Sequence, residues 1–118
     1  MGVTTIQTII TNLEGNKKVT GEFLVDTGTA YTVVPKKMAE SLGLKPIKSQ
    51  KFSLADGTTV QRKLGSAIVK IDGNEAASTV VIGQKDDSPL LGVITLEGRG
   101  LMVDPFKRKL RPMRLMLA

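Results

Sequence analysis

Residues 23–30 read FLVDTGTA, and this stretch decides which fold we expect. Three apolar residues, typical of a buried strand, lead directly into Asp26. A carboxylate at the end of such a strand is costly to bury without a partner, so its presence needs an explanation. Gly28 permits another backbone to approach closely, and the hydroxyls of Thr27 and Thr29 can hold a carboxylate in one orientation. The stretch therefore predicts a buried strand that delivers Asp26 into a tight turn.

The same residues also fit a purely structural Asx turn, in which the Asp26 side chain accepts hydrogen bonds from its own downstream amides. Taken alone, Asp-Thr-Gly favours this structural interpretation, because a three-residue motif often matches by chance. The rest of the sequence has to decide between a simple turn and a catalytic loop.

Composition restricts the chemistry. The chain has 118 residues and contains no Cys and no His. This excludes a thiolate nucleophile, a disulfide, a Ser–His dyad and an imidazole metal ligand. If the protein is a hydrolase, carboxylates are the expected general acid and base, ahead of Lys or Tyr. We expect no metal and no cofactor.

The length suits a single domain over residues 1–118, and the residue pattern predicts an all-β fold. Aromatic residues make up only 3% of the chain, so the core has to be aliphatic. Alternating and β-branched apolar residues predict strands over residues 3–11, 19–27, 31–34, 52–54, 59–61, 66–71, 76–82, 101–104 and 110–117.

Two short helical segments interrupt the predicted strands. A helix is expected to begin with Pro35 at its first position and to run through residues 36–42, with Gly43 as a left-handed cap. A helical turn is expected over residues 93–97. Asp56-Gly57 and Asp72-Gly73 are strong signals for tight hairpin turns.

Four features in order along the chain support the catalytic interpretation. The Asp-Thr-Gly-Thr motif is followed by a strand that ends at Pro35, then by a hairpin turn at Ala55-Asp56-Gly57-Thr58, and finally by Leu90-Leu91-Gly92. In this order and spacing the chain resembles the retropepsins, the single-domain clan AA aspartic proteases. The resemblance covers roughly residues 3–105.

The resemblance implies a closed, barrel-like β fold with one or two short helices, acting as a homodimer because each chain carries one Asp-Thr-Gly. Asp26 of each subunit would form the catalytic pair of an aspartic endopeptidase. Two adjacent carboxylates share one proton, so one can activate a water while the other polarises the peptide carbonyl of an extended substrate.

The resemblance also assigns roles to neighbouring residues. Thr27 would bond across the dimer axis, Gly28 would offer backbone to the substrate, and Thr29 would orient the carboxylate of Asp26. The turn at Ala55, Asp56, Gly57 and Thr58 would be a flap that closes over the peptide. Three residues, Leu90, Leu91 and Gly92, would pack beneath the catalytic loop. Retroviral members commonly place an Arg shortly after this late Gly, whereas here the first one is Arg99.

The remaining acids are interpreted as structural. We expect Asp72, Asp86, Asp87 and Glu97 to be solvated turn residues. Asp104, which precedes Pro105, is expected to shape a turn.

The net charge of +6 raises the question of an anionic partner. A basic C-terminal segment, residues 107–118, contains Lys107, Arg108, Lys109, Arg111 and Arg114. Because only four aromatic side chains are available for stacking, we expect a solvated edge or an anionic contact rather than a nucleic-acid partner. No apolar run approaches the about 20 residues of a membrane span, and no signal-peptide pattern opens the chain, so a cytoplasmic protein is expected.

Two other functions remain open. A catalytically silent retropepsin-like module could use the same fold for dimerisation or peptide binding. A small β-barrel could instead bind nucleic acid through the basic segment, with a steep dependence on salt.

Overall fold

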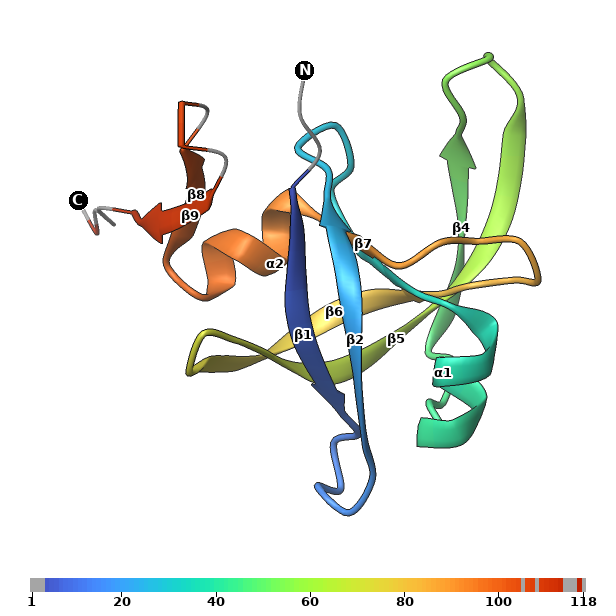
Figure 1. Ribbon diagram of the computed structural model, residues 1–118. Helices are drawn as coiled ribbons and strands as arrows, with labels where there is room; N and C mark the ends of the chain where they lie inside the picture. Colours follow the sequence, from blue (N-terminus) through green and yellow to red (C-terminus); the bar gives the residue numbers. More distant parts are fainter. Residues whose placement is uncertain (1–3, 105, 108, 114–116, 118) are drawn as a thin grey trace.

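A computed structural model describes residues 4–104, 106, 107, 109–113 and 117 (Figure 1). These residues form, in chain order, β1 (Thr5–Thr11), β2 (Lys18–Val25), β3 (Thr32–Val34), α1 (Lys36–Leu42), β4 (Lys48–Ser53), β5 (Thr59–Ile71), β6 (Asn74–Ile82), β7 (Leu90–Leu91), α2 (Val93–Gly98), β8 (Leu101–Asp104) and β9 (Lys109–Pro112).

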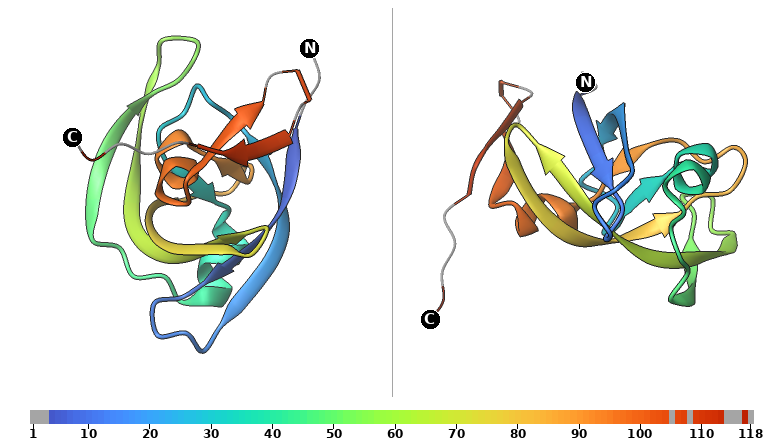
Figure 2. Two further views of the ribbon diagram at one scale, coloured as in Figure 1. Left: turned by 90° about the vertical axis from the view of Figure 1, so that its left-hand side faces the viewer. Right: turned by 90° about the horizontal axis from the view of Figure 1, so that it is seen from below.

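The first seven strands form one sheet in the order β1-β2-β7-β3-β6-β5-β4. Because β1 pairs with β5 as well as with β2, six of the strands close into a ring (Figure 2). Of the strands in this sheet, β4 alone lies outside the ring, in a hairpin with β5 that extends away from the ring (Figure 1). The mostly β fold with its ring of strands agrees with the retropepsin-like fold expected from the sequence.

The core fills the ring with aliphatic side chains, as the composition predicted. Burial alternates along β5, where Ala67, Val69 and Ile71 are fully buried. Phe23 of β2 is also fully buried and is the aromatic member of the core cluster. Ala39 and Leu42 place one face of α1 against the same cluster.

The helix predicted over residues 36–42 is confirmed by α1. Gly43 ends it with φ 63°, a left-handed conformation that favours glycine. Pro35 was expected at the first helical position but is the N-cap instead, with an extended ψ of 154°. The chain therefore enters the helix one residue later than the sequence indicated.

The two predicted hairpins share one strand. The sequence suggested separate strands over residues 59–61 and 66–71, whereas β5 runs unbroken from Thr59 to Ile71 and pairs with β4 and then with β6. Gly65 lies within this strand, and its lack of a side chain permits the backbone of another segment to pass close by. A Cβ at Gly65 would lie 3.0 Å from the carbonyl oxygen of Lys45.

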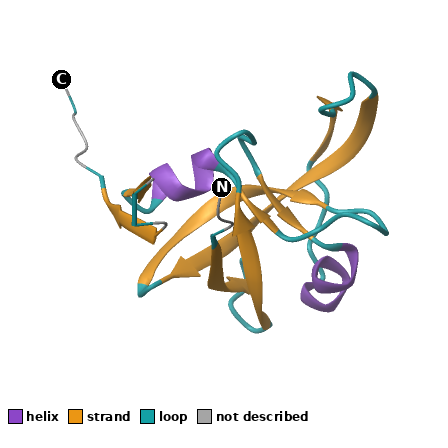
Figure 3. Ribbon diagram, turned by 45° about the horizontal axis from the view of Figure 1, so that its top comes forward, coloured by secondary structure: helices purple, strands orange, loops and turns teal. Residues whose placement is uncertain are grey.

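The chain leaves the ring through α2 and a separate two-stranded sheet. β8 and β9 pair with Leu101 opposite Pro112, on the side of the ring away from the β4–β5 hairpin (Figure 3). The predicted closing strand over residues 110–117 is thus observed as the shorter β9. Parts of the predicted strands and of the basic segment, at residues 3, 108, 114–116 and 118, lie outside the described residues.

The helices of the described residues are short. None of them is long and apolar enough to cross a membrane.

Candidate active site

The loop that carries Asp26 follows β2 directly. The sequence placed residues 26 and 27 inside the strand, but β2 ends at Val25 and the chain turns through residues 26–29 before β3. Asp26 is half-buried, while Thr27 and Gly28 are exposed at the tip of the loop. The loop therefore presents its tip to the outside of the molecule.

Leu90, Leu91 and Gly92 lie beside this loop, although more than sixty residues separate them from it in sequence. Strand β7 pairs in parallel with the end of β2, so that Leu24 lies opposite Leu90 and Val25 opposite Leu91. The amide of Asp26 donates to the carbonyl of Leu91 at 3.0 Å. Two amides that follow Gly92, those of Val93 and Ile94, donate to the carbonyls of Thr29 and Ala30 at 3.0 Å each.

Gly92 occupies a position that no side chain fits. A Cβ there would lie 2.5 Å from the carbonyl oxygen of Ala30 and 2.5 Å from the carbonyl carbon of Tyr31. Both are backbone atoms of the segment that follows the Asp26 loop, so they cannot swing aside. The late glycine thus permits the two segments to pack backbone against backbone.

The Asp26 carboxylate is held by its own loop. Its Oδ1 accepts a hydrogen bond of 2.9 Å from the amide of Gly28, and Thr29 N donates to the Asp26 carbonyl at 3.2 Å. This is the Asx-type turn that the sequence offered as the alternative, and it holds the carboxylate in one orientation. Within the described part of the chain this carboxylate accepts no other hydrogen bond.

The Thr29 hydroxyl makes no hydrogen bond to the Asp26 carboxylate within the described residues. It donates to the carbonyl of Tyr31 at 3.5 Å, a long hydrogen bond. The roles expected for Thr27 and Thr29 stay predictions, because each was assigned from the resemblance to a dimeric site.

A buried cluster of hydroxyls beneath the loop was not predicted from the sequence. Thr32 Oγ1 donates to Thr95 Oγ1 at 2.7 Å, and Ser78 Oγ lies 2.9 Å from the same Thr95 oxygen. Thr32 also accepts from the amide of Gly92 at 3.1 Å. The cluster therefore links β3, β6 and α2 around Gly92. Isolated Ser and Thr residues carry no spacing signal by which it could have been found.

Arg99 anchors the end of α2. Its guanidinium is buried and donates to the carbonyls of Val69 (2.8 Å), Thr95 and Ala76. Burial lowers the pKa of this side chain. Arg99 thereby fastens α2 to β5 and β6, and its partners within the described residues are all backbone oxygens.

The predicted flap turn lies at the tip of the β4–β5 hairpin. Gly57 has φ 88°, and the Asp56 carboxylate accepts from the amide (2.9 Å) and the hydroxyl (2.6 Å) of Thr58. The hydroxyl bond is the main reason that the pKa of Asp56 lies below its usual value. Ala55, Asp56, Gly57 and Thr58 are all exposed, and they do not line the pocket that the same hairpin covers.

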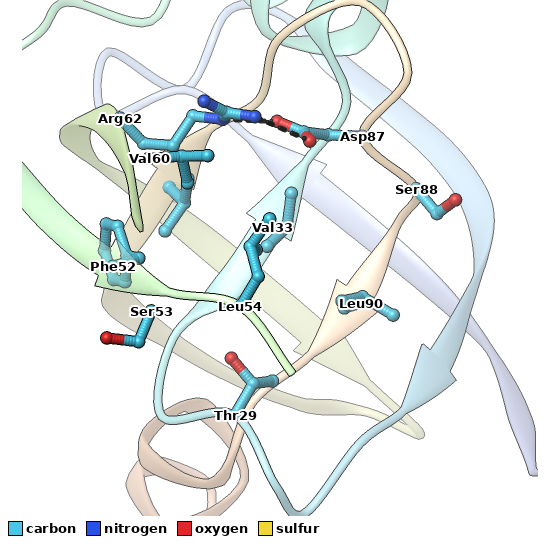
Figure 4. A pocket seen from close by; sticks show the side chains of 11 residues that line it. Thr29, Val33, Phe52, Ser53, Leu54, Val60, Arg62, Asp87, Ser88 and Leu90 are labelled. Atoms are coloured by element: carbon cyan, nitrogen blue, oxygen red, sulfur yellow. Dashed lines mark hydrogen bonds and ion pairs between the residues drawn. The ribbon is translucent and has the colours of Figure 1, made fainter. Parts of the chain in front are cut away.

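That pocket, of about 190 Å³, lies between the β4–β5 hairpin and the body (Figure 4). Thr29 of the Asp26 loop lies at one end. Its apolar lining comes from both the hairpin and the ring: Val33, Phe52, Leu54, Val60, Val81 and Leu90. An edge-to-face contact of 6.1 Å between the rings of Tyr31 and Phe52 joins β4, close to the hairpin turn, to the segment that follows the Asp26 loop.

An ion pair lines the same pocket, and it corrects one expectation. Asp87 was expected to be solvated, but it is half-buried and bonds Arg62 twice, at 2.7 Å to Nε and 3.1 Å to Nη2. The guanidinium is the main reason that the pKa of Asp87 lies below its usual value. Asp104 does shape a turn as predicted, because it accepts from the amides of Phe106 and Lys107.

A second hollow, of about 280 Å³, lies on the α2 side of the Asp26 loop. It is mostly apolar, and its lining residues come from the loop tip, α2, β8 and the end of β9: Thr27, Val93, Leu96, Glu97, Leu101, Met102, Val103 and Met113. In the described residues no cluster of three acidic side chains is placed to hold a metal ion.

Comparison with known proteins agrees with this geometry. A family model described as "gag-polyprotein putative aspartyl protease" matches residues 11–98. The match contains the Asp26 loop, the β4–β5 hairpin and the Leu90–Leu91 strand, and it ends before β8 and β9. The chain belongs to this retropepsin-like family of aspartic proteases. No curated protein sequence matches it.

Proposed function

We propose that two copies of this chain form one aspartic endopeptidase, with Asp26 of each subunit in a shared active site. The observation that carries the proposal is the Asp26 loop itself. It presents a half-buried carboxylate in a fixed orientation at an exposed tip, and the late Leu-Leu-Gly segment braces it from behind. A simple structural turn does not require that brace.

The need for a second subunit follows from the chemistry. Hydrolysis by carboxylates requires one group that activates water and a second that protonates or polarises the carbonyl. The chain contains one Asp-Thr-Gly motif. A twofold axis beside the exposed Thr27 and Gly28 would bring the two copies of that motif together. The apolar hollow beside Thr27 offers surface that such a contact would cover.

The paired carboxylates would share one proton, because two negative charges so close together are mutually unfavourable. The ionised member would draw a proton from a water as that water attacks the peptide carbonyl. The protonated member would donate a hydrogen bond to the carbonyl oxygen and stabilise the tetrahedral intermediate. The hydrogen bond from Gly28 would keep each carboxylate in place through these steps.

The substrate would be an extended peptide that lies between the Asp26 loop and the β4–β5 hairpin. The hairpin tip, Ala55 to Thr58, would close over it and add backbone hydrogen bonds. One substrate side chain would enter the apolar pocket between Thr29 and the Arg62–Asp87 pair.

Digestion of a mixed peptide library from pH 3 to pH 7 tests the proposal, with the wild-type protein compared with Asp26→Asn. We expect cleavage that is strongest on the acid side and absent in the variant, because Asn cannot exchange the proton. Cleavage by both proteins would contradict the role of Asp26. Peptide binding without cleavage, at protein concentrations that drive dimerisation, would favour a silent peptide-binding module.

A further inference from the structure

The pocket beneath the β4–β5 hairpin has two chemically different ends. Thr29, next to the Asp26 loop, lies at one end, and the Arg62–Asp87 pair lies at the other (Figure 4). Between them the walls are aliphatic, with Val33 and Leu90 from the body and Leu54 from the hairpin. A peptide side chain that enters from the Asp26 loop would therefore contact aliphatic residues first and reach the charged pair only at the far end.

The opposite charges of Arg62 and Asp87 at the far end balance each other in one close contact. Arg62 Nε and Nη2 each donate to one carboxylate oxygen of Asp87, a two-point contact that is stronger than a single one. The amide of Gln84 also donates to Asp87, at 2.7 Å. The side chains are only 21% and 26% exposed. The two charges thus neutralise each other in a place where water screens them little.

The two partners come from different elements of the chain. Arg62 lies on β5, within the stretch that pairs with β4 in the hairpin, and Asp87 lies in the loop between β6 and β7. The pair therefore joins the hairpin to the body while it closes the pocket.

We propose that the Arg62–Asp87 pair determines which side chain this pocket accepts. While the pair is intact, the pocket takes an uncharged aliphatic side chain. Loss of either partner converts it into a pocket for a side chain whose charge is opposite to that of the partner left behind. This inference rests on the proposed function, because it assigns the pocket to a peptide side chain.

The physical reason is the cost of an unpaired charge beside apolar walls. Without Arg62, the Asp87 carboxylate would face the pocket with no cation to balance it, which is strongly unfavourable. A Lys or Arg of the substrate would supply that cation. Without the charge of Asp87, Arg62 would be the unbalanced group, and a Glu or Asp of the substrate would supply the anion.

Two variants of opposite sign test this, together with a matched control. Arg62→Met keeps the apolar stem and removes the cation, and Asp87→Asn keeps the shape and removes the anion. Lys63→Met removes one positive charge from the adjacent, exposed residue of β5, whose side chain points to the other face of the strand and is not part of this pocket. Each protein is tested against peptides that vary at one position at a time.

For Arg62→Met, we expect the cleavage of peptides with Lys or Arg, relative to peptides with Leu, to rise about ten-fold. The effect should appear at one peptide position or at two positions related by the twofold axis. For Asp87→Asn, we expect a similar rise in the relative cleavage of peptides with Glu or Asp. Lys63→Met should keep the wild-type preference. A general loss of folding cannot produce two opposite gains. Unchanged preferences in both pocket variants, while the wild-type protein cleaves, would overturn the inference and leave the proposed function standing.

The same peptides are also measured for binding, by fluorescence anisotropy, to the pocket variants carrying Asp26→Asn. Opposite charge preferences in binding, with no cleavage by the wild-type protein, would support the pocket and overturn the endopeptidase. Absence of both binding and cleavage would overturn both.

Discussion

At the scale of single residues, a local motif predicted the turn at Asp26, whereas the prediction that Asp87 is solvated was wrong. Asp26 lies in a loop whose turn is closed within three residues, so its surroundings can be inferred from adjacent sequence. The partner of Asp87 is Arg62, which lies 25 residues away along the chain. No local pattern indicates that contact, because it depends on how the hairpin packs on the loop between β6 and β7.

Gly92 provides a prediction at this scale. Gly92→Ala should lower the free energy of unfolding by about 3 kcal/mol, because its Cβ would overlap two backbone groups that have no room to move. Equilibrium unfolding in urea measures the change.

Gly98→Ala is the matched control for that substitution. A Cβ at Gly98 meets nothing within 4 Å at the end of α2, so this variant should be neutral or slightly more stable. Equal losses in the two variants would contradict the tight packing that we assign to Gly92.

At the scale of elements, prediction succeeded where the signals are local. The bounds of α1 were correct to within one residue, because the proline before it and the left-handed glycine after it mark its ends. The unbroken β5 was not predicted, since Gly65 lies there for a close approach of Lys45 rather than for a turn. The hydroxyl cluster that joins β3, β6 and α2 was not predicted either, because its members become neighbours only in the folded chain.

That cluster gives the prediction at the element scale. Thr95→Val should lower the free energy of unfolding by about 1–3 kcal/mol, because it removes the acceptor of the fully buried Thr32 hydroxyl and one of the partners of the half-buried Ser78 hydroxyl. The double variant Thr95→Val, Ser78→Ala should recover little of the loss, because the Ser78 hydroxyl keeps its hydrogen bond to the carbonyl of Thr79 at 3.1 Å.

Thr20→Val on the exposed side of β2 is the control, and thermal or urea unfolding is the measurement. This control should have little effect, because it changes an exposed position. If Thr95→Val were as mild as Thr20→Val, the hydroxyl cluster would not be what holds α2 against the ring.

At the scale of the whole molecule, the ring of strands was predicted by resemblance and not by local patterns. It closes through the pairing of β1 with β5, residues about sixty apart in sequence, and nothing in either strand alone specifies that partner. The single domain over residues 1–118 and the homodimer stay predictions. The proposed chemistry depends on the dimer, because a lone subunit would carry half of a catalytic pair.

Mixing of active and inactive subunits tests that claim most directly. Wild-type protein and Asp26→Asn are combined at constant total concentration, allowed to exchange subunits, and assayed for peptide cleavage. With equal amounts, about one quarter of the dimers carry two Asp26 residues, so activity should fall to about one quarter of the wild-type value. Mixing with Lys63→Met should leave activity unchanged. A fall to only about one half would mean that each subunit acts alone, and it would contradict the shared active site.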